Sequence, residues 1–226
     1  MNTPQTPLHY FITGTDTDAG KTYVTRLMAE SLRDQGYEVA LFKPIASGCD
    51  RPNDRLSNAD IARFHEFDSS VPVELLNKWY FEPAIAPHIA AEEVGVNLSL
   101  NTLCQEMPKL YSERAQFKAY DIALTEGAGG WKLPLNSRET LDQWVIEQSM
   151  GIILVVGMKL GCINHALLTV ENILHQQVRL CGWIANIPED MPRLDENLET
   201  LKALIPVPCL GVVEKGQTKL SQPLRI

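Results

Sequence analysis

Short apolar runs recur along the chain, separated by longer segments with helical spacing. Each run has the length of a strand, and positions 152–156 are apolar throughout. A run that is apolar at every position is typical of the middle of a parallel sheet, where both faces are covered. Strands are therefore predicted at residues 8–13, 38–43, 121–125, 151–156, 182–186 and 209–213.

The segments between these runs carry apolar residues three and four positions apart, which predicts amphipathic helices. Residues 22–35 form one such helix, and Gly36 is suited to end it. In residues 164–178 an apolar stripe is formed by Leu167, Val170, Leu174 and Val178. Further helices are predicted at residues 58–65, 98–118, 140–148 and 194–204.

The alternation of strands and helices predicts the fold class. Helices that connect parallel strands cover both faces of the sheet, so we expect a three-layer α/β fold. Without a linker or repeat, residues 1–226 are predicted to form one domain. Two stretches rich in Pro, Asn, Gly and Asp, residues 46–57 and 79–98, are predicted to be long functional loops.

Composition narrows the class of partner. The formal net charge is −8, which argues against nucleic acid or an anionic membrane surface as the main partner. No apolar run approaches the roughly 20 residues of a membrane-spanning helix. The five cysteines are scattered without a C-x-x-C pair, so neither disulfides nor a zinc site is expected. This pattern predicts a location in the reducing cytoplasm.

A glycine-containing loop follows the first predicted strand and ends in Gly20-Lys21-Thr22 at the start of a helix. This strand–loop–helix context is that of a P-loop, in which backbone N–H groups and the lysine hold phosphates and the Thr hydroxyl contacts Mg²⁺. Gly14 lies one position too early for the usual spacing, and an ordinary strand-to-helix turn is the alternative. The candidate nucleotide-binding residues of this loop are Asp18, Ala19, Gly20, Lys21, Thr22 and Tyr23.

Charged residues also follow two other predicted strands. Glu126 ends the strand at 121–125 and precedes Gly127-Ala128-Gly129, where small residues let the backbone approach an anion. Lys43 follows the strand at 38–43 and precedes a Ser47-Gly48 turn. Because parallel strands end at one edge of the sheet, Lys21 and Lys43 are predicted to face one crevice with Glu126. Asp60 starts a predicted helix and is either a cap or a metal ligand.

Another strand–loop–helix segment contains Gly161, Cys162 and Asn164. The free N–H groups of a helix N-terminus suit a carboxylate, so these residues are candidates for binding a substrate carboxylate. Capping of the helix by Asn164 explains the asparagine equally well.

These segments together resemble dethiobiotin synthetase. The similarity is carried by residues 13–22 (TGTDTDAGKT), 43–48 (KPIASG), 126–131 (EGAGGW), 156–166 (VGMKLGCINHA) and 182–186 (GWIAN), and runs from about residue 8 to residue 211. The early glycine of the P-loop is this family's own spacing. Two positions depart from the family: Ile187 follows Asn186 in place of Asp, and residues 212–216 replace a Pro-x-Leu turn.

The resemblance implies a P-loop NTPase-like fold and an enzyme that uses ATP and Mg²⁺ to convert 7,8-diaminononanoate and CO₂ to dethiobiotin, ADP and phosphate. A carbamate would attack the γ-phosphate, and the resulting carbamic-phosphoric anhydride would close to the cyclic urea. It further implies a homodimer, with the substrate carboxylate held across the interface.

The resemblance also assigns roles to single residues. Lys21 and Lys43 would stabilise the transferring phosphoryl group, and Asn186 would contact the adenine. The implied metal ligands are Thr22, Asp60 and Glu126. The implied substrate contacts are Thr17 and Ser47, with the carboxylate at Gly161, Cys162 and Asn164.

Two other classes share parts of this pattern. A cobyrinate-type amidoligase has the same P-loop variant but adds a glutaminase domain, for which the chain has no room. A ParA- or MinD-like ATPase switch would carry a second lysine in the P-loop or a basic or amphipathic tail. Asp16 and Asp18 occupy the loop here instead.

Overall fold

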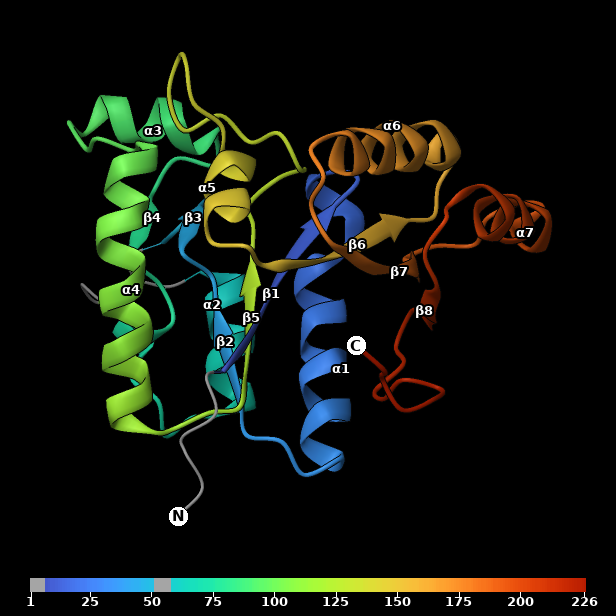
Figure 1. Ribbon diagram of the computed structural model, residues 1–226, viewed down its shortest axis with the longest axis horizontal. Helices are drawn as coiled ribbons and strands as arrows, with labels where there is room; N and C mark the ends of the chain where they lie inside the picture. The colour runs from blue at the N-terminus through green and yellow to red at the C-terminus, as the bar shows by residue number, and fades with distance from the viewer. Residues whose placement is uncertain (1–6, 51–57) are drawn as a thin grey trace.

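A six-stranded parallel sheet forms the centre of the computed structural model, which describes residues 7–50 and 58–226 (Figure 1). The strand order is β2-β5-β1-β6-β7-β8, and every pairing is parallel. The predicted α/β class with a mainly parallel sheet is confirmed. The strands are β1 (Leu8–Gly14), β2 (Val39–Phe42), β5 (Ile122–Glu126), β6 (Gly151–Gly157), β7 (Leu180–Ile187) and β8 (Cys209–Glu214).

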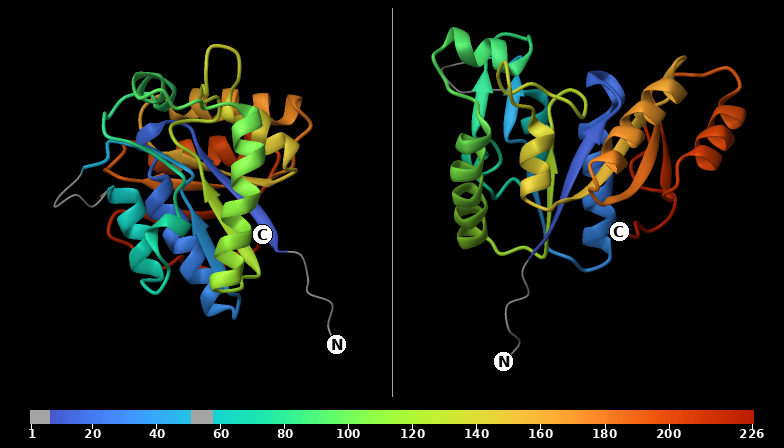
Figure 2. Two further views of the ribbon diagram at one scale, coloured as in Figure 1. Left: turned by 90° about the vertical axis from the view of Figure 1, so that its left-hand side faces the viewer. Right: turned by 45° about the horizontal axis from the view of Figure 1, so that its top comes forward.

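Helices cover both faces of this sheet, which gives the three layers seen in Figure 2. One hydrophobic core lies under α1 (Lys21–Asp34) and α2 (Ala59–Phe67). The other core lies under α4 (Leu100–Phe117), α5 (Leu141–Glu147), α6 (Cys162–His175) and α7 (Leu194–Leu204). None of the helices in the described part of the chain is long and apolar enough to cross a membrane.

Strand β6 shows why its sequence is continuously apolar. Its alternate residues Ile152, Leu154 and Val156 pack into the core of the α4–α7 face. Ile153 and Val155 point the other way, into the core of the α1–α2 face. A strand in the middle of a doubly covered sheet has no face exposed to solvent, so neither set of side chains can be polar.

The two predicted long loops contain regular structure that the sequence pattern did not reveal. Strands β3 (Ile45–Ser47) and β4 (Trp79–Phe81) pair in a second, two-stranded parallel sheet, and α3 (Pro87–Glu93) follows. Strands of three residues are too short to show a period, and the buried side chains of Trp79 and Phe81 hold them to the core. Residues 51–57 of the first predicted loop lie outside the described residues.

The apolar stripe predicted for α6 packs on the core only in part. The helix begins at Cys162 and buries Cys162, Ala166, Val170 and Ile173. Of the predicted stripe, Val170 is buried, Leu167 and Val178 are partly buried against the core, and Leu174 is 40% exposed. Leu160, Leu168 and Leu174 remain exposed.

Candidate functional site

The loop between β1 and α1 is tightly folded. It contains a 3-10 turn at Thr17–Ala19, and Gly20 has φ 83°, a left-handed conformation that favours glycine. A Cβ on Gly20 would also lie 2.1 Å from the amide nitrogen of Asn186. A Cβ on Gly14 would lie 3.1 Å from the Ala19 Cβ and the Lys21 Cδ. The early glycine is therefore explained by a turn that brings the end of the loop back over its beginning.

Lys21 lies inside this loop. Its Nζ donates to the backbone oxygens of Asp16 (3.0 Å) and Thr17 (3.2 Å). The side chain is buried, and burial, followed by repulsion from the nearby Lys43 ammonium, lowers the pKa of Lys21 to about 8. Among the described residues, the Lys21 ammonium has no carboxylate within ion-pair distance. A buried ammonium in this state is ready to bind an anion, because the anion can replace the hydration that burial removed.

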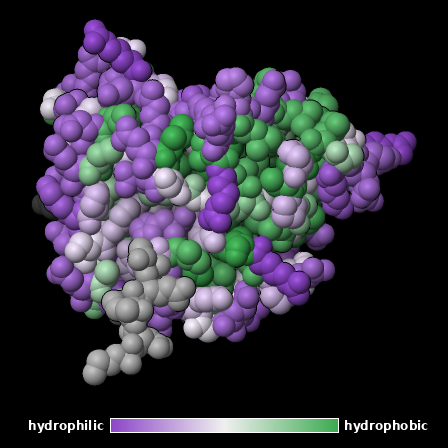
Figure 3. Space-filling view, in the orientation of Figure 1, coloured by the Kyte–Doolittle hydropathy of each residue, from purple (hydrophilic) through white to green (hydrophobic). Residues whose placement is uncertain are grey.

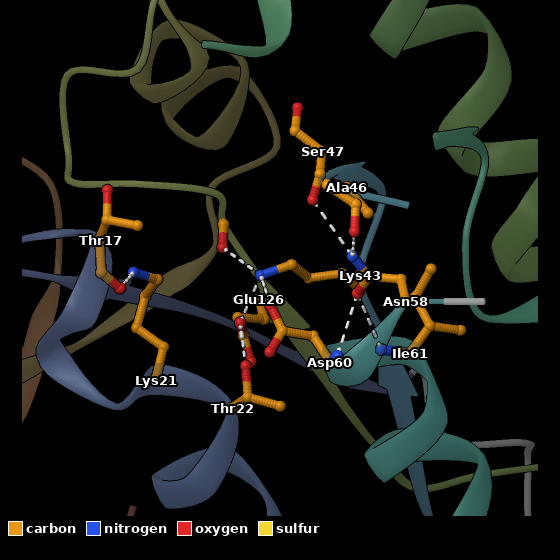
Figure 4. Close-up of polar contacts among 12 residues, drawn as sticks. Thr17, Lys21, Thr22, Lys43, Ala46, Ser47, Asn58, Asp60, Ile61 and Glu126 are labelled. Atoms are coloured by element: carbon orange, nitrogen blue, oxygen red, sulfur yellow. Dashed lines mark hydrogen bonds and ion pairs between the residues drawn. The ribbon is translucent and has the colours of Figure 1, made fainter. Parts of the chain in front are cut away.

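The sheet register brings Lys43 and Glu126 together. Phe42 of β2 pairs with Thr125 of β5, so the next residues of the two strands, Lys43 and Glu126, are adjacent. Lys43 Nζ lies 2.5 Å from Glu126 Oε1 and also donates to the Gly127 oxygen at 3.1 Å. Figure 4 shows the lysine side chain extending across the end of the sheet toward this carboxylate.

Two further groups complete this cluster. Asp60 Oδ2 lies 3.1 Å from Lys43 Nζ, and the Thr22 hydroxyl donates to Glu126 Oε1 at 2.8 Å. Asn58 caps α2 by accepting from the backbone N–H groups of Asp60 and Ile61, which leaves the Asp60 carboxylate free to face the cluster. The cap role that the sequence left open for Asp60 therefore belongs to Asn58.

The cluster shifts the pKa of its members. Burial alone would lower the pKa of Lys43, but the adjacent carboxylates of Glu126 and Asp60 outweigh it and hold that pKa above its usual value. Burial alone would raise the pKa of Asp60, but Lys43 and the Thr22 hydroxyl hold it below its usual value. The charged forms of Lys43 and Asp60 are therefore favoured at neutral pH.

The oxygens of this cluster fit a hard divalent cation. Glu126 Oε2 is buried and has no hydrogen-bond partner among the described residues. Thr22 and Asp60 add a hydroxyl and a second carboxylate on the same side. Mg²⁺ is typically bound by one or two carboxylates together with substrate phosphates and water, and the described residues contain no larger His, Cys, Asp or Glu cluster for a metal.

A cavity of about 710 Å³ opens over the P-loop and this cluster. Twelve of the candidate residues line it: Thr17, Asp18, Gly20, Lys21, Thr22, Tyr23, Lys43, Ser47, Asp60, Glu126, Ala128 and Gly129. The Ser47 hydroxyl is buried and has no partner among the described residues, so it is available to a ligand. The sequence missed the remaining lining residues: Ala46, Arg63, Ala84, Ile85, Ala86, Pro87 and Leu133.

Six candidates do not line this cavity. Ala19 is buried in the loop, and Gly127 contributes the oxygen that Lys43 binds. Asn186 is buried and donates to the Ala19 oxygen at 3.0 Å. The next residue, Ile187, lines a second cavity of about 670 Å³. The other three, Gly161, Cys162 and Asn164, lie at the start of α6, where Gly161 rather than Asn164 is the N-cap.

The chain is similar to proteins of one known family. A protein-family model described as an AAA domain matches residues 9–223. The ATP-dependent dethiobiotin synthetase BioD of Pseudoalteromonas translucida is 43% identical over 205 residues, covering 90% of this chain and 88% of that protein. This chain belongs to the dethiobiotin synthetase family. The family inferred from the sequence motifs is confirmed.

A second member of the dethiobiotin synthetase family, from Cellvibrio japonicus, is 45% identical over 209 residues, covering 91% of this chain and 89% of that protein. Among solved structures, the MinC:MinD cell division protein complex of Aquifex aeolicus contains a similar chain. It has a TM-score of 0.52 and 13% identity, covering 92% of this chain and 81% of that chain. This likeness shows a shared fold and nothing about activity.

Proposed function

We propose that this protein is an ATP- and Mg²⁺-dependent dethiobiotin synthetase, which makes dethiobiotin, ADP and phosphate from 7,8-diaminononanoate, CO₂ and ATP in biotin biosynthesis. The observation that carries the proposal is the entry of Lys21 and Lys43 into one cavity beside Thr22, Asp60 and Glu126. Membership of the family supports the choice of substrate. The fold shared with the MinC:MinD complex does not by itself favour a partner-binding ATPase switch for this chain.

The polar floor of the cavity suits phosphoryl transfer. In the proposed complex, Lys21 and the backbone N–H groups of the loop bind the β- and γ-phosphates. Thr22, Asp60 and Glu126 would hold Mg²⁺, which when bound neutralises charge on the phosphate oxygens. Lys43 lies beside Asp60 and Glu126 and would stabilise the negative charge that develops on the transferring phosphoryl group.

The chemistry proceeds on the substrate. One amine of the diamine adds CO₂ and loses a proton to give a carbamate. A carbamate oxygen attacks the γ-phosphorus, and ADP leaves. The second amine attacks the carbamoyl carbon, expels phosphate and loses a proton, which closes the cyclic urea. Thr17 and Ser47 line the cavity and would orient the carbamate or the diamine.

We further propose that the enzyme acts as a homodimer. Gly161, Cys162 and Asn164 lie outside the cavity of their own chain, so they would bind the carboxylate of substrate held by the partner subunit. The exposed leucines Leu160 (97%) and Leu168 (58%) on and beside α6 support this contact. Figure 3 shows hydrophobic surface gathered on the side of the molecule that carries α5 and α6.

Three finer points complete the proposal. We propose that the adenine lies in the cavity that begins at Ile187, within reach of Asn186. We propose that residues 1–226 form one domain, since both cores pack on a single large sheet. A cytoplasmic location is proposed from the five cysteines, all of which are free thiols.

One assay tests the proposed function. The purified protein is mixed with diaminononanoate, bicarbonate, Mg²⁺ and ATP, and both phosphate and cyclic urea are measured. We expect the two products in equal amounts, and neither without the diamine. ATP hydrolysis that does not depend on the diamine, without cyclic urea, would contradict the ligase function.

A further inference from the structure

Arg63 is a third cation of the cavity, beside the two lysines. It lies on α2 one turn after Asp60 and lines the same cavity as Lys21 and Tyr23. Its side chain is exposed, so a ligand that enters the cavity can reach it. The two lysines already have oxygen partners within the protein, namely backbone oxygens for Lys21 and the two carboxylates for Lys43.

Both acidic residues that could pair with Arg63 along its own helix are engaged elsewhere. Asp60, three residues earlier, pairs with Lys43 at 3.1 Å. Glu66, three residues later, pairs with Arg26 of α1 at 3.0 Å. Residues three apart on a helix are neighbours, and a surface arginine commonly pairs with such a carboxylate. Within the described residues, Arg63 therefore has no carboxylate partner, although two lie on its own helix.

The direction of α2 turns the Arg63 side chain toward the side of the cavity that Asp60 lines. Side chains on an α-helix lean toward the helix N-terminus, so Arg63 leans toward the turn that contains Asp60. That turn faces the start of α1, where Thr22 and Tyr23 also line the cavity. The apolar wall at Ala84–Pro87 comes from a different part of the chain and offers no charge.

We propose that Arg63 binds the β- and γ-phosphates of the nucleotide, together with Lys21. A guanidinium is always charged and its planar fork matches two oxygens of a phosphate. A nucleoside triphosphate carries more negative charge than one Mg²⁺ and one lysine neutralise, and Lys43 is held by two carboxylates. This inference rests on the proposed nucleotide site and adds a residue to it.

Nucleotide binding without turnover tests the inference. Isothermal titration calorimetry compares the full chain with the variants Arg63→Met, Arg63→Lys and Arg138→Met, using a non-hydrolysable Mg²⁺–ATP analogue and AMP. Arg138 is a matched control, because it is an exposed arginine that does not line the cavity. We expect Arg63→Met to weaken the triphosphate analogue about tenfold and AMP less than about twofold, with partial recovery in Arg63→Lys.

Three results would overturn the assignment: a triphosphate affinity within about twofold of the unmodified protein, an equal loss for AMP, or an equal loss in Arg138→Met. Thermal unfolding of each variant shows whether the fold is kept. The proposed ligase function fails separately, since an unmodified protein that binds the analogue but forms no cyclic urea would sink that function and leave the role of Arg63 standing.

Discussion

At the residue scale, the site consists of buried charges that depend on one another. Lys43 lies within ion-pair distance of both Asp60 and Glu126. The Thr22 hydroxyl donates to the Glu126 carboxylate. The sequence supplied these residue types because each follows a predicted strand or begins a predicted helix. It did not supply the 2.5 Å contact between Lys43 and Glu126, since this depends on the register between two strands far apart in the chain.

Replacing Lys43 by methionine should lower kcat by about a hundredfold or more, because a preorganised charge on the transferring group is lost. The nucleotide KM should change little, since Lys21 and the loop still hold the phosphates. Steady-state kinetics measures both constants, and Lys78→Met, outside the cavity, is the control. Near-normal turnover with an intact fold would remove Lys43 from the catalytic residues.

Replacing Glu126 by glutamine should raise the Mg²⁺ concentration required for half-maximal activity, because one carboxylate oxygen is exchanged for a neutral amide. The position is buried, and glutamine keeps the volume of the glutamate side chain. The amide oxygen can still accept the hydrogen bond from the Thr22 hydroxyl. A Mg²⁺ titration of the activity at fixed ATP measures the effect. An unchanged titration curve would argue against Glu126 as a metal ligand.

Nucleotide affinity should fall above about pH 8, where the buried Lys21 loses its proton in the free protein. Bound phosphates favour the charged lysine and raise its pKa, so binding is strongest below the pKa of the free protein and weakens as the pH rises. The dissociation constant of ADP without Mg²⁺ should rise by at most about tenfold per pH unit. Lys21→Met should abolish this dependence, and a flat profile from pH 7 to 9.5 in the unmodified protein would contradict it.

At the element scale, the glycine-rich segment after β5 is fastened to two helices. The Trp131 indole donates to Asn172 of α6 at 3.0 Å, and Lys132 Nζ lies 2.6 Å from Asp142 Oδ2 of α5. Gln176, which follows the end of α6, donates to the same carboxylate oxygen at 3.0 Å. The sequence predicted each helix but not these contacts, which follow from how the two helices pack on one face of the sheet.

Replacing Lys132 by methionine should destabilise the protein, because it leaves the fully buried Asp142 carboxylate with Gln176 alone. Lys132 is half exposed, so we expect only about 1–2 kcal/mol, less than for a fully buried pair. Adding Asp142→Asn should recover most of the loss, since the buried charge is removed. Denaturant unfolding of both variants measures this, and a double variant no more stable than Lys132→Met would contradict the explanation.

At the scale of the whole molecule, the order of the strands decides where the site forms. β1 lies between β5 and β6, so the P-loop, Glu126 and the start of α6 are carried on neighbouring strands. After β1 the chain passes to β2 on one side of it, and after β5 it passes to β6 on the other side, so the order of strands reverses at β1. Ligands of open α/β sheets bind at the carboxyl ends of the strands beside such a reversal. The start of α6 nevertheless lies outside the cavity, which is why we propose that a partner subunit supplies it.

Mixing two inactive variants tests this sharing of sites. If Lys43 of one subunit works with Asn164 of the other, a mixed dimer of Lys43→Met and Asn164→Asp has one site with both substitutions and one with neither. Equal mixing with subunit exchange should therefore restore about a quarter of normal activity. Light scattering confirms the dimers, and a mixture no more active than its components would contradict the shared site.

The sequence by itself determined the strands and helices that are long enough to show a period, and the residue types of the phosphate-binding loop. Those features are local, because a glycine conformation or an apolar face depends on neighbouring residues. Only the tertiary structure decided the pairing of β3 with β4, the buried face of α6, the place of Arg63 in the cavity and the engagement of its neighbours Asp60 and Glu66. Each of these depends on segments that are distant in the chain and become neighbours only when the sheet and its helices pack together.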